Sequence, residues 1–564
     1  MPRIWNIALN NRALQKKLST ALNISPFLAQ LLINRHIYDI KEAKDFLNPS
    51  LSSLSSPFLL TDMEAACQRI KKALTHKEKV MIFGDYDVDG ISSVAILKSV
   101  LDSLGFSTHY YLPHRINEGY GLNSNVLKIA KQNNIKLLIT VDCGISNFSE
   151  VEELKREGID VIITDHHLPV DSRTPAALAI INPRQTKKDT PYKNLAGVGV
   201  AYKFACALLE KELEEYLDLV CLGTVADSVP LLGENRIIVK KGLEKLINTC
   251  RPGLKALIEI GGLKKDYFST CDIAYILAPR INASGRIDTA YRALKLFLAS
   301  SKEEAEELAK ELNHLNYLRQ RIEEDILEEA RIMIERDINF KENKVIVLAK
   351  DGWHEGVLGI IASRIKNMLN RPTVMISLKE KEGRGSARSI ENFHIMEAFL
   401  ECRDILKNFG GHPLAAGFSI LRENLERFKE RLNRLAEEKL TPQDIQPSLN
   451  IDMQIGLKDL SPQLLEEIKL LEPFGEGNPP TLFYTPSLSL RAEPVVLNKD
   501  TLKLWVTDGN FTYPAIGFNM GHLKDYLNKV EFFDLVYCLQ DSKGNNFEKF
   551  VLKIEDIRLG PFVS

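Results

Sequence analysis

The stretch VMIFGDYDVDGISS, residues 80–93, sets three aspartates close together directly after an apolar run. The apolar run predicts a buried strand, and in an extended strand end Asp85, Asp87 and Asp89 project to the same side. Carboxylates this close raise one another's pKa and destabilise a fold unless a cation neutralises them. The stretch therefore indicates either a cation site or a solvated acidic turn or helix cap.

Later segments carry acidic and imidazole side chains at the same kind of position. Asp142 follows the apolar run LLITV, and Asp165, His166 and His167 follow VIIT. A fourth apolar stretch, CLGTVA, ends at Asp227. Strands without polar alternation, each followed by a helical pattern, predict a parallel sheet covered on both faces. Because such sheets bind ligands beyond the carboxyl ends of their strands, these side chains favour the cation site over an acidic turn.

The predicted donor set consists of carboxylate oxygens with one or two imidazoles. This set suits Mn²⁺ or Mg²⁺, because both cations accept oxygen ligands and manganese also tolerates nitrogen. The acids are numerous enough for two ions. Two such ions activate a water and stabilise the leaving oxygen during displacement at phosphorus, so the pattern indicates metal-assisted hydrolysis of a phosphoester.

Composition limits the class of protein. A chain of 564 residues is too long for one core and predicts three or four domains. Its 45% hydrophobic and 26% charged residues are typical of globular proteins, and the net charge of −2 does not exclude a nucleic-acid substrate. The eight cysteines form no C-x-x-C pair. No apolar run reaches the roughly 18 residues of a membrane span, so a reduced, cytoplasmic protein is expected.

The order of patterns predicts an α/β protein in five segments. The longest helical pattern, from Ser301 to residue 338, contains no Gly or Pro and favours a rigid connector over an ordinary bundle helix. After about residue 470, short alternating strands between turn residues suit a small barrel of about five strands. The expected segments are an N-terminal helical cap (1–56), a parallel-sheet catalytic domain (57–300), a long connecting helix (301–338), a smaller α/β domain (339–445) and an OB-like β-barrel (446–564).

Several motifs together resemble one enzyme family. GDYDVDG, VDCG, TDHH and GTVADSVPL occur in the order and rough spacing of the four metal-binding motifs of the DHH phosphoesterase superfamily. GGHPLAAGFS resembles the glycine-rich signature of its DHH-associated domain. PHRINEGYGLN, APRINASGR, GWHEGVLGIIASRI and LEPFGEGNPP look like the bacterial single-strand-specific 5′ exonucleases of this superfamily. The likeness runs from about residue 30 to the C-terminal β segment.

The resemblance implies a catalytic centre with two metal ions, Mn²⁺ or Mg²⁺. Its implied ligands are Asp85, Asp87, Asp142, His166 and Asp227. The resemblance also implies Asp89 and His167 as further catalytic groups that support the metal site. His167 is expected to donate a proton, to orient a water, or only to hold a ligand by a hydrogen bond. Smaller members of the superfamily carry a His where this chain has Met81.

Substrate contacts are expected from cations, imidazoles and closely packed glycines. The predicted substrate-binding residues are His114, Arg115, Arg280, Asn282, Arg286, His354, Ser386, Arg388, Gly411 and His412. For each arginine a solvated surface position is equally expected, and His354 is alternatively a helix cap. Tyr120, Trp505 and Phe511 are candidates for base stacking, against a role in packing.

The leading hypothesis implied by the resemblance is a nuclease. It is a 5′-to-3′ exonuclease that hydrolyses single-stranded DNA to mononucleotides in repair and recombination, working with a helicase and a single-strand-binding protein. One alternative is a phosphoesterase of the same superfamily acting on small molecules or short oligonucleotides. Another is a scaffold that binds nucleic acid without catalysis.

Overall fold

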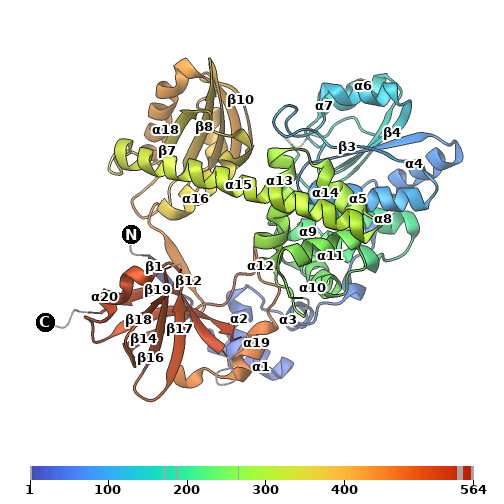
Figure 1. Ribbon diagram of the computed structural model, residues 1–564. Coiled ribbons are helices and arrows are strands. Elements are labelled where there is room, and N and C mark those ends of the chain that lie inside the picture. The colour runs from blue at the N-terminus through green and yellow to red at the C-terminus, as the bar shows by residue number, and fades with distance from the viewer. Residues whose placement is uncertain are drawn as a thin grey trace. The chain divides into compact units, whose positions relative to one another are not determined.

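The structure is a computed structural model that describes residues 3–169, 173–185, 189–264, 266–498, 500–542 and 550–560. These residues divide into two compact units (Figure 1). The first unit contains Ser55–Val229 and Lys241–Pro447, and the second contains Arg3–Leu54, Pro230–Lys240 and the described part of Ser448–Ser564. The N-terminal helices therefore share a unit with the C-terminal segment, which the sequence pattern does not indicate.

The first sheet of the first unit is parallel throughout, as predicted, with strand order β3-β2-β4-β5-β6. Its strands are β2 (Lys79–Gly84), β3 (His109–Tyr111), β4 (Ile135–Val141), β5 (Asp160–Thr164) and β6 (Ala179–Ile181). β2, β4, β5 and β6 are largely buried on both faces, which explains their continuous apolar sequences, whereas β3 at the edge is half-buried.

Helices cover both faces of this sheet. The helices α6 (Ser124–Gln132) and α7 (Phe148–Arg156) share one core with alternate strand residues. From the opposite face α4 (Met63–Thr75), α5 (Val88–Ser103) and α8 (Gly197–Leu209) pack against the strands. The arrangement leaves the carboxyl ends of the strands as the position for polar side chains.

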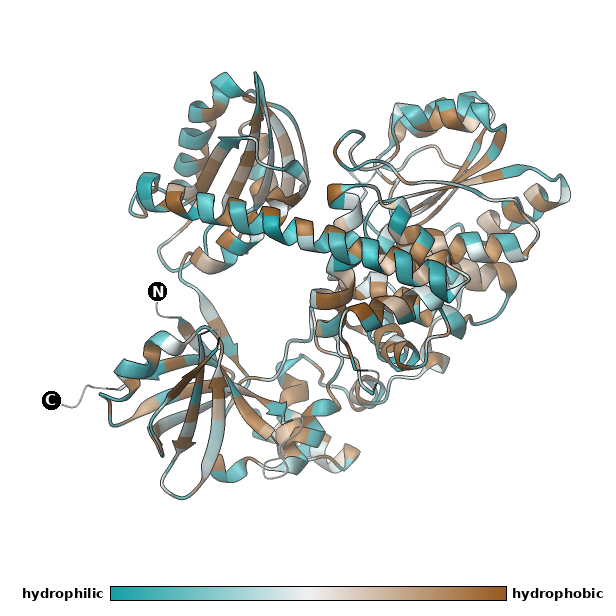
Figure 2. Cartoon of the chain, viewed as in Figure 1, coloured by the Kyte–Doolittle hydropathy of each residue, from teal (hydrophilic) through white to brown (hydrophobic). Residues whose placement is uncertain are grey.

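A helical segment follows the sheet. It consists of α9 (Leu217–Ala226), α10 (Gly233–Ile247), α11 (Pro252–Ile260), α12 (Thr270–Asp272), a π-helical turn (Ile273–Leu277), α13 (Ala278–Ile287) and α14 (Tyr291–Leu298). The connecting helix α15 (Lys302–Asp337) then runs for 36 residues, as the sequence predicts. It is largely hydrophilic in Figure 2, and its buried residues recur every three or four positions along one stripe.

The second sheet of the first unit is mixed, with strand order β10-β11-β9-β8-β7. Only β7 and β8 pair in parallel. Its strands are β7 (Ile346–Asp351), β8 (Thr373–Lys379), β9 (Glu382–Arg388), β10 (Leu406–His412) and β11 (Ala415–Leu421). Its helices are α16 (Leu358–Leu369), α17 (Ile395–Leu400) and α18 (Leu425–Lys439). This is the smaller α/β domain that the sequence predicts.

The second unit contains a closed barrel. The strands β14, β18, β19, β17 and β16 pair in this order, and β16 pairs back to β14. They are β14 (Phe483–Leu490), β16 (Thr501–Thr507), β17 (Thr512–Gly517), β18 (Phe533–Asp541) and β19 (Phe550–Leu559), with β13 (Met453–Gln454) and β15 (Val495–Leu497) at the edges. The five-stranded barrel confirms the OB-like prediction.

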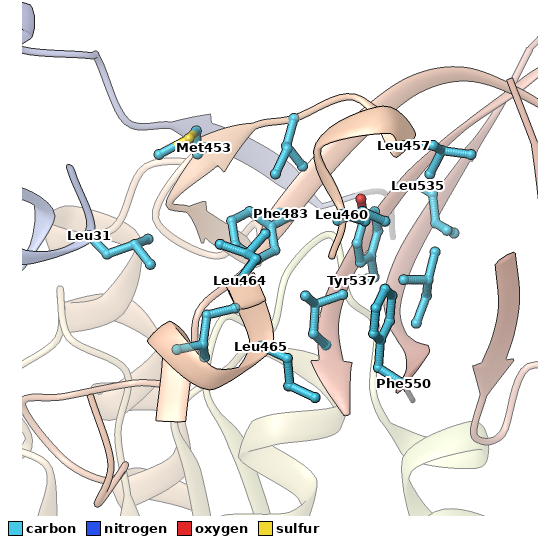
Figure 3. Close-up of a cluster of buried hydrophobic side chains, with 14 of the residues drawn as sticks. Leu31, Met453, Leu457, Leu460, Leu464, Leu465, Phe483, Leu535, Tyr537 and Phe550 are labelled. Atoms are coloured by element: carbon cyan, nitrogen blue, oxygen red, sulfur yellow. The ribbon is translucent and has the colours of Figure 1, made fainter. Parts of the chain in front are cut away.

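The N-terminal helices complete the core of this unit. The helices α1 (Arg12–Leu22), α2 (Pro26–Asn34) and α3 (Ile40–Leu47) join α19 (Pro462–Lys469), α20 (Lys524–Leu527) and the barrel in one apolar cluster. Figure 3 shows Leu31 of α2 in this cluster with Leu464 and Phe483. The strand β1 (Ile4–Ile7) also pairs in parallel with β12 (Ser448–Ile451).

One buried arginine links these separate stretches of sequence. The guanidinium of Arg236 donates to the backbone oxygens of Phe46 (2.8 Å), Leu471 (2.9 Å), Glu472 (3.0 Å) and Leu470 (3.2 Å). It also lies over the Phe46 ring, 3.7 Å from the centroid. Burial lowers the pKa of Arg236 to about 9, with a further contribution from Arg35.

We predict that Arg236→Met destabilises the second unit by roughly 3 kcal/mol or more, because four buried carbonyl groups lose a charged donor. Denaturant unfolding followed by tryptophan and tyrosine fluorescence measures this. Arg427→Met removes an arginine from an exposed ion pair and serves as the control. Equal unfolding midpoints for the two variants would contradict the role of Arg236.

Candidate metal centre and anion cavity

The three clustered aspartates occupy different kinds of position. Asp85 follows β2, but Asp87 is the N-cap of α5 and accepts a hydrogen bond from the backbone N–H of Gly90 (3.1 Å). Asp89 lies in the first turn of this helix. The expectation that all three extend from a strand is therefore wrong, because the N-cap of Asp87 starts the helix at once.

Asp89 is buried and anchors the next helix of the site. Its two carboxylate oxygens accept hydrogen bonds from the backbone N–H groups of Gly197 (2.8 Å) and Val198 (2.6 Å), at the start of α8. Burial and the charge of Asp87 raise the pKa of Asp89 to about 7. The geometry suits a supporting group whose oxygens are already engaged by the protein.

His166 lies at the centre of the acidic cluster. Its Nε2 atom is 3.1 Å from Oδ1 of Asp142, 3.5 Å from Oδ2 of Asp227 and 3.8 Å from Oδ2 of Asp89. Asp142 follows β4 with a left-handed backbone (φ 59°), which is uncommon for a residue with a side chain. Asp227 is the C-cap of α9 and not a strand end, so a helix delivers it to this edge.

The cluster offers three overlapping groups of ligand atoms. Within each group these atoms lie within 4.8 Å of one another. The groups are Asp85–Asp87–Asp142, Asp89–His166–Asp227 and Asp142–His166–His167. The structure thus brings together all five residues that the resemblance implies as metal ligands.

The donor atoms fit a divalent cation. Oδ1 of Asp85, Oδ1 of Asp142 and Nε2 of His166 are buried and make no hydrogen bond within the described residues. Burial raises the pKa of Asp85, Asp142 and Asp227, and the neighbouring carboxylates raise them further. Burial, with the charge of His167, lowers the pKa of His166 to about 3, so its imidazole is neutral and can act as a ligand. Buried carboxylates without partners are costly, and a hard divalent cation removes this cost.

His167 differs from His166 in charge and partners. Its Nδ1 lies 2.8 Å from Oδ1 of Asp165 and 3.0 Å from the hydroxyl oxygen of Tyr120. The O–H group of Tyr120 donates to the Asp142 carbonyl (3.1 Å). Burial opposes the charge of His167, but the hydrogen bond to Asp165 and the nearby carboxylate charges together outweigh burial and raise the pKa of His167 to about 9. At Asp165 the same bond and the charges of the two histidines together outweigh burial and lower its pKa to about 2. Tyr120 therefore contacts His167, and its hydroxyl is hydrogen-bonded within the protein.

An arginine-rich cavity lies within the same unit. Its volume is about 240 Å³, and its lining includes Tyr86, Arg115, Arg384, Gly356 and Ser386. The guanidinium of Arg115 lies over the Tyr86 ring, 4.9 Å from the centroid.

Two further arginines contact this lining. Arg286 donates to the Gly356 carbonyl (2.9 Å), and Arg388 donates to the Ser386 hydroxyl (3.1 Å). Burial and neighbouring arginines lower the pKa of Arg286 to about 9 and that of Arg388 to about 10. Glu355 also lines the cavity and pairs with Arg384 (3.3 Å). The cations that indicate an anion site are therefore Arg115, Arg286 and Arg388.

Other predicted substrate-binding residues are engaged with the protein. Arg280 donates to the Ile276 carbonyl (2.6 Å) and to Asn313 (3.0 Å), so part of its guanidinium holds helices together. Asn282 accepts from the backbone N–H of Val88 (3.2 Å) and supports the start of α5. His354 accepts from Gly356 N–H (3.1 Å), which is the capping alternative.

The remaining predicted residues lie on the loop after β3 and at the end of β10. Nδ1 of His114 accepts from the backbone N–H groups of its own loop at Ile116 and Asn117, both at 3.3 Å. Gly411 has a positive φ of 147°, and a side chain there would meet the Ala415 carbonyl. The ring of His412, at the end of β10, stacks on His167 with centroids 5.8 Å apart. The second α/β domain therefore reaches the DHH motif.

Sequence reasoning missed two residues of this edge, Asn182 and Arg184. Asn182 follows β6 and donates to the His167 carbonyl (2.9 Å), and Arg184 is two residues further on. The sequence does contain a signal for them. Polar residues follow the apolar run ALAII in the same way that the DHH motif follows the apolar run VIIT. Gly197 was also missed, and a side chain there would meet the Asp142 carboxylate.

Comparison with known proteins agrees with the motifs. The chain matches the DHH family, N-terminal domain (residues 79–224), the DHHA1 domain (342–438) and the RecJ OB domain (451–556). It is 38% identical to the single-stranded-DNA-specific exonuclease RecJ of Bacillus subtilis, over 98% of this chain and 70% of that protein. The Escherichia coli protein of the same name is 34% identical over 85% of this chain and 86% of its own length.

A solved structure resembles the chain as a whole. RecJ from Thermus thermophilus in complex with Mn²⁺ matches with a TM-score of 0.85 and 30% identity, over 99% of this chain and 80% of that chain. The matched domains, their order and the identity over most of the chain lead to one conclusion. The chain belongs to the RecJ family.

Proposed function

We propose that this chain is a metal-dependent exonuclease that hydrolyses single-stranded DNA from the 5′ end to mononucleotides, in DNA repair and recombination. The observation that carries the proposal is the presence, within one compact unit, of an acidic and imidazole cluster and an arginine-lined cavity. Relatives at 34–38% identity are named single-stranded-DNA-specific exonucleases, which supports the same substrate here.

The proposed metal ligands are Asp85, Asp87, Asp142, His166 and Asp227. RecJ structures in complex with Mn²⁺ and with Mg²⁺ support ions of this kind. When bound, such ions supply electrostatic stabilisation of the phosphoryl oxygens and an activated water. The protein contributes the neutral imidazole of His166 and the orientation of the carboxylates.

Hydrolysis by water forms a new bond from its oxygen to phosphorus, and the water releases one proton to the solvent. The bond from phosphorus to the 3′ oxygen of the terminal nucleotide breaks, and its electron pair stays on that oxygen. The leaving oxygen then needs a proton. His167 is the proposed donor, because its partner Asp165 keeps it protonated at neutral pH.

The cavity is the proposed site of the 5′-terminal phosphate. Ser386, Arg388, Arg286 and Arg115 supply the donors, and a phosphate held there places the next phosphodiester at the acidic cluster. This arrangement sets both the 5′ polarity and the step of one nucleotide. Base stacking by the barrel, through Trp505 or Phe511, remains a prediction, and Phe511 is exposed.

A finer part of the proposal concerns cellular context. The enzyme works in the cytoplasm with a helicase that exposes single strands and with a single-strand-binding protein. Among the described residues no helix is long and apolar enough to cross a membrane.

Asp142→Ala is predicted to lower hydrolysis by at least about 100-fold, because it removes a carboxylate shared by two of the ligand groups. Binding of single-stranded DNA in EDTA, measured by fluorescence anisotropy, stays close to that of the unchanged protein. Asp102→Ala removes a carboxylate from a solvent-accessible ion pair on α5 and is the control. Equal cleavage by the two variants would show that the ligand assignment is wrong.

Arg388→Ala is predicted to abolish most of the preference for a 5′-phosphate over a 5′-hydroxyl, a change of about 10- to 100-fold in the ratio of kcat/KM values. The reason is the loss of a guanidinium beside Ser386. Arg427→Ala, on an exposed ion pair of the same domain, keeps the preference. If Arg388→Ala leaves this ratio unchanged, the cavity does not bind the 5′-terminal phosphate.

Metal binding is predicted to stabilise the fold in a pH-dependent way. Because the pKa values of Asp85, Asp89 and Asp142 are raised in the folded protein, its stability without metal falls as pH rises from the ordinary carboxylate range through the raised values. Mn²⁺ relieves the repulsion between these carboxylates, so adding Mn²⁺ raises the Tm of the protein more at about pH 8 than at about pH 6. Thermal unfolding with Mn²⁺ and with EDTA measures both. An increase that is independent of pH argues against a cation among these carboxylates.

A further inference from the structure

Arg184 comes to the acidic cluster from a strand that none of the metal-binding motifs includes. The strands β5 and β6 are parallel neighbours, with Thr164 opposite Ile181. The DHH motif follows Thr164 directly, and Arg184 lies three residues after Ile181. Both segments therefore leave the sheet at the same level and on adjacent strands.

Asn182 ties the two segments together. It is 1% exposed, and its side-chain amide donates to the carbonyl of His167 (2.9 Å). Its Oδ1 accepts from the backbone N–H of Arg184 (2.8 Å). The backbone of Arg184 is thus held by the same side chain that holds the DHH motif.

The guanidinium of Arg184 has no protein partner among the described residues. Its Nε is buried and makes no hydrogen bond, although the residue as a whole is half-buried. Arg286 and Arg388, by contrast, donate to Gly356 and Ser386. Withdrawing a donor from water without a partner costs free energy, so a cation left in this state indicates an anion that binds there.

The position of Arg184 relative to the cluster follows from its backbone contacts. Asn182 binds the His167 carbonyl and the backbone N–H of Arg184, so Arg184 lies beside the DHH motif. Arg184 does not line the arginine-rich cavity. Its anion is therefore a phosphate at the acidic cluster and not the terminal phosphate in the cavity.

We propose that Arg184 is a catalytic residue that binds a non-bridging oxygen of the scissile phosphate and stabilises the negative charge that develops during hydrolysis. The inference rests on the proposed exonuclease function. An arginine suits this role because its planar fork keeps two donors in fixed geometry. Donors directed at developing charge accelerate the reaction without needing to tighten substrate binding.

The test compares Arg184→Gln and Arg184→Lys with the unchanged protein and with Arg156→Gln, which removes an exposed arginine from the same domain. Two substrates are used, a 5′-phosphorylated dinucleotide and a longer 5′-phosphorylated single strand. The dinucleotide contains the scissile phosphate and no phosphate beyond it. We expect Arg184→Gln to lower kcat by about 100-fold on both substrates with little change in KM, and Arg184→Lys to recover part of the loss.

A second readout does not depend on turnover. Anisotropy of the labelled long strand in EDTA gives similar affinities for Arg184→Gln and Arg156→Gln, because the cavity still holds the terminal phosphate. Thermal unfolding checks that each variant is folded. If Arg184→Gln does not fold, the test uses Arg184→Lys alone, which keeps the charge and the aliphatic stem. The expected result for Arg184→Lys is a kcat below that of the unchanged protein.

Two results would overturn the inference, and a third would refute the function on which it rests. A loss confined to the long strand would assign Arg184 to a downstream phosphate. A kcat equal to that of Arg156→Gln, for a folded variant, would show that Arg184 makes no catalytic contact. An unchanged protein that hydrolyses neither substrate would instead refute the proposed function, which separates the two failures.

Discussion

The burial of several carboxylates and one neutral imidazole at a single sheet edge is the constraint on which the rest of the first unit depends. Asp85, Asp89 and Asp142 are each almost inaccessible to water, and together they would repel one another strongly. The surrounding structure is organised to keep them in place. The start of α8 binds Asp89 through two backbone N–H groups, and Gly197 leaves room for the Asp142 carboxylate.

Opposite charge accumulates nearby in the same unit, and α15 connects the two regions. Glu323 of this helix is fully buried, accepts from Arg319 (2.6 Å) and pairs with Arg364 of α16 (3.1 Å). Its negative charge also acts on Arg286, beside the cavity. The buried carboxylate of Glu323 thus links the long helix to the second α/β domain, close to the arginines of the cavity. An acidic cluster and a basic cavity joined by a rigid helix suit a substrate with successive phosphates.

Much of this arrangement could be predicted from sequence, because it follows from local patterns. Unbroken apolar runs predict parallel strands, and polar residues after each run predict a shared edge, which is where Asp142 and His166 lie. The 36-residue helix and the five-stranded barrel also follow from periodicity and turn residues.

The contacts that could not be predicted from sequence depend on packing between distant segments of the chain. That Asp89 binds the start of α8 cannot be read from its neighbours, since Gly197 is more than a hundred residues away in the chain. The hydrogen bond from Val88 N–H to Asn282 likewise joins residues that only the folded chain brings near. Arg184 was missed because it belongs to no acidic motif, and its partner Asn182 becomes visible only when β6 lies beside β5.

We propose that the acidic cluster and the arginine cavity act together on the 5′ end of a single strand. The most direct measurement is a time course of products from an internally labelled single strand with Mn²⁺, for ends that carry a 5′-phosphate, a 5′-hydroxyl or a bulky 5′ block, beside the same sequence as a blunt duplex. We expect mononucleotides as the first product from the phosphorylated single strand, and little product from the blocked strand or the duplex. Release of longer fragments first, or equal cleavage of the blocked strand, would contradict it.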